Sequence, residues 1–177
     1  YFGNLKLSSE NKSINYNFKN KSYLKNKKWW CAISTHKDED IFCLKTHLKI
    51  KLVHKEIVTI IIPRHIDRVQ KINLLCKKLN LKSQILTKKE SIKKNTEIII
   101  INSYGVMANY LSHAKSIFIG KSMIKKLKNV GGQNPIEAAK LGCKIYHGPY
   151  VYNFQEIYET FNKKKISEKI KNVNGLS

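Results

Sequence analysis

Apolar stretches alternate with amphipathic stretches along the chain from about residue 27 onward. The apolar stretches are short, rich in Ile and Val, and apolar at consecutive positions, which is typical of strands buried on both faces. They predict strands over 29–33, 57–62, 83–86, 97–101, 116–120 and 143–147. The stretches with helical spacing predict helices over 38–52, 66–79, 104–114, 134–141 and 153–163.

This alternation predicts an α/β fold, a Rossmann-like parallel sheet with helices on both faces. Residues 1–26 are polar with scattered aromatics and no sustained period, so we expect a lead-in or linker segment there and one domain over 27–177. Thr35 and Asp38 approximate a capping box for the helix at 38–52. No apolar run approaches the roughly 20 residues of a membrane helix, so we expect the chain itself to be soluble.

Ligands of such sheets bind outside the carboxyl ends of the strands. In the loop after the fifth predicted strand, Asn134 suits an N-cap and Glu137 suits a capping-box carboxylate. Gly131 and Gly132 precede the cap, where they would let the backbone approach a ligand and direct N–H groups at an anion. Two interpretations stay open: a nucleotide phosphate at this helix start, with Glu137 accepting from ribose hydroxyls, or a well-capped helix after a tight turn.

Two other loops at the same edge carry candidate ligand-binding side chains. Arg64 and His65 follow the second predicted strand, and a guanidinium suits bidentate phosphate recognition. After the first strand, Ser34 and Thr35 suit helix capping as well as ligand contact, and His36 fits either role. Paired carboxylates and metal-ligand spacings are absent from the sequence, which offers no convincing general base. The four cysteines are widely separated and predict free thiols.

The formal net charge of +22 is compatible with a nucleic-acid or anionic-membrane partner. However, only Arg64 and Arg68 are arginines, and the richness in Lys, Ile and Asn also fits an A/T-rich coding bias that produces a solvated basic surface. Most aromatic residues lie in apolar strands or in the lead-in, rather than between lysines as a stacking platform.

Four segments taken together resemble the carboxyl-terminal domain of the 3-deoxy-D-manno-octulosonic acid (Kdo) transferases. They are "AISTHKDED" (32–40), "IIIPRHIDR" (60–68), "IFIGKS" (117–122) and "GGQNPIEAAKLGCKIYHGPYVYNF" (131–154). Their order is the specific feature, and with "FGNLKL" (2–7) the resemblance covers nearly the whole chain. Departures from the family pattern are Ala138, Tyr150, Lys121 and a longer, more basic segment at 123–130.

The resemblance implies the donor-binding half of a GT-B type, inverting glycosyltransferase that moves Kdo from CMP-Kdo to a lipid A precursor. It implies no cofactor and no catalytic metal, and it places the catalytic carboxylate, the acceptor and the membrane contact in an amino-terminal half that this fragment lacks. We therefore expect no catalytic residue here, no transfer by the fragment alone, and a full-length protein at the cytoplasmic face of the bacterial inner membrane. The implied donor-binding residues are Ser34, Thr35, His36, Pro63, Arg64, His65, Gly131, Gly132, Gln133, Asn134 and Glu137.

Two alternatives stay open, the first of them from another class of protein. One is a basic α/β module that binds nucleic acid. The other is a glycosyltransferase domain for a UDP- or GDP-sugar, because the fold alone does not specify the nucleotide. The combination of Pro-Arg-His with GGxNPxE is what favours CMP.

Overall fold

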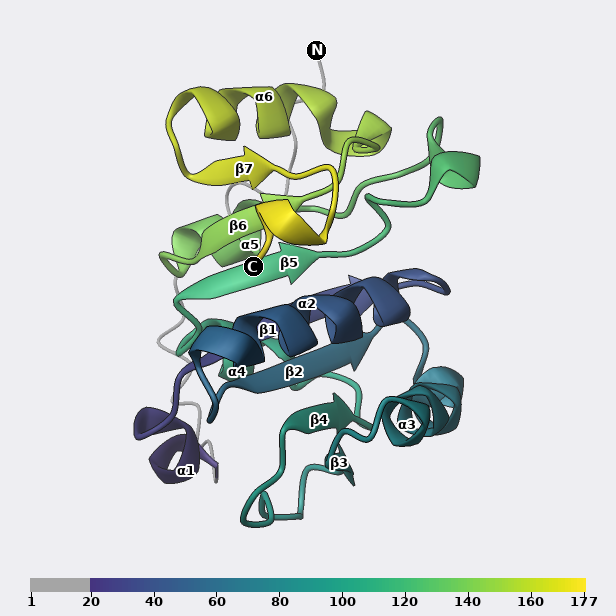
Figure 1. The fold of residues 1–177 in the computed structure, drawn as a ribbon. Helices are drawn as coiled ribbons and strands as arrows, with labels where there is room; N and C mark the ends of the chain where they lie inside the picture. The colour runs from purple at the N-terminus through teal and green to yellow at the C-terminus, as the bar shows by residue number, and fades with distance from the viewer. Residues whose placement is uncertain (1–19) are drawn as a thin grey trace.

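Seven parallel strands form one sheet in residues 20–177, the part of the chain that the computed structural model describes (Figure 1). Their order across the sheet is β3-β4-β2-β1-β5-β6-β7. The strands are β1 (Trp29–Thr35), β2 (Val58–Pro63), β3 (Ser83–Leu86), β4 (Ile98–Ile101), β5 (Ser116–Ile119), β6 (Lys144–His147) and β7 (Ser167–Lys169).

Helices cover both faces of this sheet and create two apolar cores. The first core lies under α1, α4, α5 and α6, and the second lies under α2 and α3. The helices are α1 (Lys21–Lys25), α2 (Glu39–Val53), α3 (Val69–Lys78), α4 (Met107–Leu111), α5 (Ile136–Lys140) and α6 (Gln155–Lys163). Short 3-10 turns are η2 (Ile66–Arg68), η3 (Lys125–Leu127), η4 (Tyr152–Phe154) and η5 (Val173–Gly175).

β-branched residues form the central strands because their side chains pack well on a pleated surface covered on both sides. All four isoleucines of β4 are buried, and neighbouring isoleucines alternate between the two cores. In the register of the central strands, Cys31 lies between Ile60 of β2 and Ile117 of β5. The predicted α/β class with a parallel sheet is therefore confirmed.

The strand order reverses at β1, and this reversal marks the expected ligand edge. Strands β2, β4 and β3 lie in that order on one side of β1, and β5, β6 and β7 lie on the other. Because crossover loops diverge at such a point, ligands of open parallel sheets bind at the carboxyl ends of the two strands that flank it. In this molecule those strands are β1 and β5, whose carboxyl ends are Thr35 and Ile119.

The predicted strands are confirmed with small shifts in their ends, but several helical details differ. The helix predicted over 104–114 contains only Met107–Leu111. The capping box of Thr35 and Asp38 is wrong, because Thr35 is a buried residue of β1 and Asp38 adopts a left-handed conformation with φ 75° and no side-chain cap. Strand β7 is an addition that the apolar pattern does not indicate.

Helix α1 lies within the segment that we expect to be a lead-in. Its Leu24 is 2% exposed and packs in the first core, so packed structure begins before residue 27. Asn20 ties this helix to the loop between β3 and β4, because its side chain donates to the Glu90 carbonyl at 3.3 Å and accepts from the Ile92 N–H at 3.0 Å. The remainder of the predicted lead-in, residues 1–19, lies outside the described residues.

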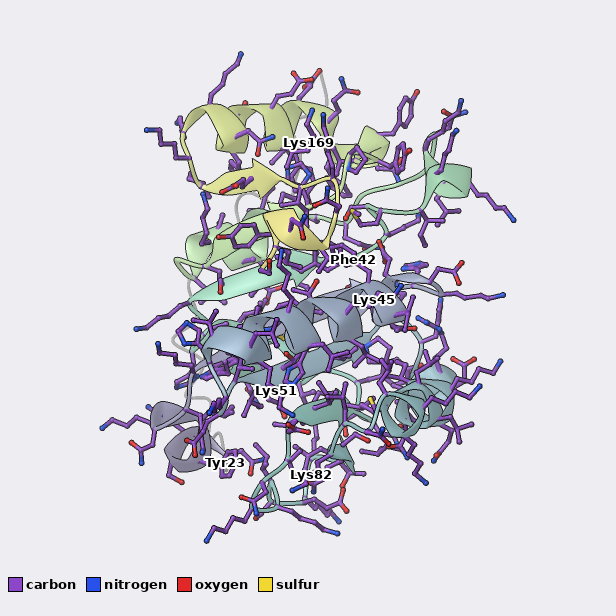
Figure 2. The ribbon with its side chains drawn as sticks, in the orientation of Figure 1. Tyr23, Phe42, Lys45, Lys51, Lys82 and Lys169 are labelled. Carbon is purple, nitrogen blue, oxygen red and sulfur yellow. The ribbon has the colours of Figure 1, made fainter. Side chains whose placement is uncertain are left out.

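Basic side chains extend from many sides of the molecule in view (Figure 2). Among the labelled lysines, Lys45 and Lys51 belong to α2, Lys82 directly precedes β3 and Lys169 ends β7. This distribution fits a generally solvated basic surface better than one basic face. Among residues 20–177, no helix has both the length and the apolar character needed to cross a lipid bilayer.

Candidate functional site at the carboxyl edge of the sheet

The loops after β1 and β2 lie against each other at the carboxyl edge. Ser34 has φ 53°, and the pairing of β1 with β2 shifts register between Ile33 and Thr35. This bulge places Thr35 opposite Pro63, and the backbone N–H of Arg64 donates to the Thr35 carbonyl at 3.0 Å. The structure thus brings the Ser-Thr-His and Pro-Arg-His segments together.

Arg64 and His65 project from the end of β2 as exposed side chains. The Arg64 guanidinium makes no hydrogen bond or ion pair with the side chains of residues 20–177. The His65 ring lies edge-on to the ring of His36, with 6.2 Å between the ring centroids. Two imidazoles therefore lie together beside the switch point, and the exposed Arg64 directly precedes one of them in the chain.

His36 is held in a defined orientation by its own backbone neighbours. Its Nδ1 lies 3.1 Å from the Ser34 carbonyl oxygen, and because a carbonyl only accepts, Nδ1 carries the proton. Burial lowers the pKa of His36, although the hydrogen bond to Ser34 opposes this effect. A ring that is neutral near pH 7 leaves Nε2 free as an acceptor, which suits contact with a hydroxyl group.

Arg68 has a different role from Arg64, although both follow β2. Its Nη2 forms a buried ion pair with the carboxylate of Asp40, and its Nη1 donates to the Thr35 carbonyl at 2.8 Å. Burial raises the pKa of Asp40 to about 6, and the opposing charge of Arg68 limits this rise. Arg68 therefore braces the end of β1 and is not available to a ligand.

Glu39 is the most connected side chain at this edge, and it did not stand out in the sequence as a site residue. It is 1% exposed, and it lies in the first turn of α2. One carboxylate oxygen accepts from the N–H groups of His36 at 3.0 Å and Lys121 at 2.7 Å. The other accepts from the N–H groups of Ser122 at 2.9 Å and Met123 at 3.0 Å. Glu39 thus ties the loop after β1 to the loop after β5 across the switch point.

Gly131 and Gly132 are buried by close backbone packing. A Cβ atom at Gly131 would lie 2.4 Å from the Tyr150 carbonyl oxygen, and Gly132 has φ 90°. The N–H of Gly132 donates to the Lys121 carbonyl at 2.7 Å. The expectation that this N–H points at a ligand anion is therefore wrong, because it is already paired within the protein.

Asn134 and Glu137 lie beside the start of α5, but the predicted capping box is not formed as such. The side-chain oxygen of Asn134 accepts from the Ile136 N–H at 3.0 Å, while α5 begins at Ile136 and the N-cap position is Pro135, one residue later than predicted. Glu137 is exposed and makes no hydrogen bond or ion pair with the described side chains, so the reciprocal half of the capping box is not formed. Gln133 is half-buried, and its carbonyl accepts from the Tyr158 hydroxyl at 2.9 Å.

The loop 131–137 is fixed from the opposite side by the segment "GPYVYNF" (148–154). The backbone N–H of Asn153 donates to the Gly131 carbonyl at 3.1 Å, and its side chain donates to the Val130 carbonyl at 2.9 Å. Helix α5 has only five residues, so its dipole adds little to the potential at this loop. Any contribution to ligand binding must therefore come mainly from side chains and from loop geometry.

Three candidate segments lie at one edge of the sheet: the first is 34–36, the second is 63–65 and the third is 131–137. The first and second contact each other directly, and Lys121 connects the first to the third. Lys121 donates its N–H to Glu39 and accepts at its carbonyl from Gly132, which links the first segment to the third. Within residues 20–177, no group of three or more His, Cys, Asp or Glu side chains has an arrangement suited to a metal ion.

Several relatives of this chain are named 3-deoxy-D-manno-octulosonic acid transferases, and one from Fusobacterium nucleatum is named a bifunctional glycosyltransferase/methyltransferase. A 3-deoxy-D-manno-octulosonic acid transferase of Haemophilus influenzae is 29% identical over 129 residues, which cover 73% of this chain and 29% of that protein. A 3-deoxy-D-manno-octulosonic acid transferase of Rickettsia felis is 28% identical over 176 residues, which cover 98% of this chain and 37% of that protein. The chain thus spans between about a quarter and two fifths of the length of such relatives. No family model matches the chain.

A solved structure shows the same fold. The C-terminal CMP-Kdo binding domain of WaaA from Acinetobacter baumannii superposes with a TM-score of 0.77 at 24% identity, over 87% of this chain and 78% of that chain. This similarity confirms the predicted fold class. Together with the relatives, it confirms that the chain resembles the Kdo transferases, as the ordered motifs indicate.

Proposed function

We propose that this chain is the donor-binding part of an inverting Kdo transferase, which moves Kdo from CMP-Kdo to a lipid A precursor. Two findings support the proposal: the relatives named as Kdo transferases and the fold shared with a CMP-Kdo binding domain. The observation that carries it is the position of the family-like segments. They lie up to about a hundred residues apart in sequence, yet they meet at one edge beside the β1/β5 switch point.

The donor's negative charge has one well-suited partner at this edge, the guanidinium of Arg64. Arg64 is exposed and makes no ion pair with described side chains, so its charge is available to a phosphate or a sugar carboxylate. His65 follows Arg64 in the chain, and His36, whose ring lies edge-on to that of His65, offers an acceptor nitrogen. Charge develops on the CMP phosphate as the glycosidic bond breaks, and Arg64 stabilises that state more than it stabilises the ground state.

The backbone amides at the switch point are not part of this donor site. The N–H groups of His36, Lys121, Ser122 and Met123 all donate to Glu39. The phosphate must therefore lie outside these amides, toward Arg64. The exposed carboxylate of Glu137 remains free to accept hydrogen bonds from the ribose hydroxyls, and Asn134 holds the start of α5 in place for this contact.

The rest of the reaction belongs to parts of the protein outside this chain. In this proposal, an amino-terminal domain binds the acceptor, supplies the catalytic carboxylate and contacts the membrane. The complete protein works at the cytoplasmic face of the inner membrane. CMP-Kdo serves as the donor substrate without a further cofactor. The 177 residues alone are expected to bind the donor weakly and to transfer nothing, which a transfer assay on the purified chain measures directly.

Calorimetric titration of the chain with CMP, UMP and GMP tests the proposal. CMP should bind at least several-fold more tightly than UMP or GMP. Arg64→Ala should weaken CMP binding by at least about tenfold, since a charge-assisted hydrogen bond contributes about 1.5–3 kcal/mol. Glu137→Gln should weaken CMP and cytidine binding to a similar extent, because both ligands carry the ribose. Equal affinity for all three nucleotides, or tighter binding to DNA than to CMP, would refute the assignment.

A further inference from the structure

A cavity of about 660 Å³ opens at the amino-terminal edge of the sheet, the edge opposite the candidate donor site. It lies between α1, the first residues of β1 and β5, the end of α2 and the carboxyl-terminal turn. Strand β1 separates the two sites, because Trp29 at its start lines the cavity and Thr35 at its end belongs to the donor edge. Seven extended residues span about 20 Å, so one small ligand does not reach both sites.

The inner wall of the cavity is apolar and aromatic. Both tryptophans of the chain line it, and Ile57 and Ile117 add buried aliphatic surface. Tyr146 and Leu176, which are partly buried, complete the wall on the side of the second core. A volume of this size falls within the range of about 300–1,000 Å³ that is usual for ligand-binding pockets.

The rim of the cavity is strongly basic. Five lysines line it, and no acidic residue is among the described residues that do so; they are Lys21, Lys25, Lys27, Lys28 and Lys115. Lys27 pairs with the exposed Glu56 at 2.8 Å, and Lys28 lies 3.4 Å from the Nδ1 atom of His54. The other three lysines are exposed and make no ion pair with the side chains of residues 20–177.

From this combination we infer a second binding site, for an anionic amphiphile whose apolar chain enters the cavity and whose phosphate headgroup contacts the lysine rim. The apolar wall alone suits any hydrophobic group, but a rim with three uncompensated lysines selects a negative headgroup. This inference does not depend on the proposed transferase function.

The position of the tryptophans gives a direct readout. Trp29 and Trp30 are the only tryptophans in the chain, and both line the cavity, so intrinsic fluorescence reports on its occupation. The 177-residue chain is titrated with dodecyl phosphate below its micelle-forming concentration. Inorganic phosphate supplies the headgroup alone, and dodecyl maltoside supplies the same chain with a neutral headgroup. Circular dichroism at each end point verifies that the fold persists.

Two triple variants with the same loss of charge separate a specific rim from the general basic surface. The rim variant combines Lys21→Gln, Lys25→Gln and Lys115→Gln. The control combines Lys71→Gln, Lys77→Gln and Lys78→Gln, three exposed lysines of α3 that do not line the cavity. A third variant, Ser116→Phe, fills the cavity from the first residue of β5 and leaves every lysine in place.

We expect saturable binding of dodecyl phosphate, at least tenfold tighter than binding of dodecyl maltoside, and no comparable response to inorganic phosphate. The rim variant and Ser116→Phe should each weaken binding by about tenfold, while the α3 variant stays within twofold of the parent. Equal losses in the two lysine variants would overturn the inference, since they would show that overall charge is responsible. Equal affinity for the neutral amphiphile, or a non-saturable response, would overturn it as well.

Vesicles then identify the source of the amphiphile. If phosphatidylglycerol vesicles sediment the parent chain and the α3 variant but not the rim variant, the ligand is a bilayer lipid. If such vesicles leave all three chains in the supernatant while dodecyl phosphate still binds at the rim, the ligand is a free amphiphile. Both outcomes support the site. Vesicle binding that is lost equally in both lysine variants counts against it.

Discussion

Replacing Glu39 by Gln tests whether one buried carboxylate holds the candidate site together. The side chain accepts four backbone N–H bonds, two at each oxygen, from the loops after β1 and β5. A glutamine has the same shape but keeps only one oxygen. Its amide group must face two of the four N–H groups, so two donors lose their acceptor and meet another donor.

The expected loss of stability follows from these two unpaired donors. Each buried polar group left unsatisfied costs about 1–3 kcal/mol, so Glu39→Gln should cost about 2–6 kcal/mol. Rotation of the amide does not help, because both carboxylate oxygens bind N–H groups. A loss of this size is a large fraction of the about 5–15 kcal/mol that stabilises a typical domain.

Urea unfolding of the 177-residue chain, followed by circular dichroism, measures this loss. Glu137→Gln is the matched control, because Glu137 is an exposed carboxylate of the same site without a described side-chain partner, and its unfolding free energy should change by less than about 0.5 kcal/mol. The CMP affinity of Glu137→Gln, in contrast, should fall, because this variant loses a ligand contact while its fold keeps its stability. A cost below about 1 kcal/mol for Glu39→Gln, with an unchanged denaturant slope, would refute the reasoning.

Three further substitutions have defined outcomes. Gly131→Ala should lower the unfolding free energy by about 1–3 kcal/mol in urea, because the new Cβ would lie 2.4 Å from the backbone oxygen of Tyr150. Burial lowers the pKa of His47 from 6.5 to about 4, so the unfolded chain takes up the proton first as pH falls, and stability present above pH 6.5 is lost toward pH 4. His47→Leu also removes the 2.9 Å bond to Thr59. Between pH 7 and pH 4, however, the free energy of unfolding of this variant should fall by about 3 kcal/mol less than that of the parent. Stability curves that run parallel over this pH range would contradict the prediction. In a transferase that contains this domain, Arg64→Ala should lower kcat/KM for the donor by at least about tenfold, or ~1.5 kcal/mol, and an unchanged rate would count against its role.

The sheet could be predicted from sequence because its strands are apolar on both faces. A run such as Ile98–Ile101 shows no helical period, and its short length and β-branched residues are typical of a buried strand. Strand β7 escaped prediction because Ser-Glu-Lys at an edge has no apolar pattern and forms through pairing with β6. Helix α1 escaped because only Leu24 of its five residues is buried, with Tyr23 packed partly buried against the core, in an otherwise polar segment.

The site was predictable only where side chains act at the ends of strands. Arg64, His65 and His36 could be placed at one edge because parallel strands end together. The role of Glu39 could not be predicted, because three of its four backbone partners lie 82 to 84 positions later, and backbone donors leave no mark in a sequence. An acid in the first turn of a helix is ordinarily explained by the helix dipole, which concealed its structural function.

The borders of the sheet affect how the molecule behaves at high concentration. The border strands β3 and β7 have only four and three residues, and β7 exposes Glu168 and Lys169. An unpaired border is a template on which a second chain can add its own strand, and short, charged borders offer little backbone for that. Lengthening β7 with alternating Val and Thr residues would remove this protection, and self-association of the altered chain would follow.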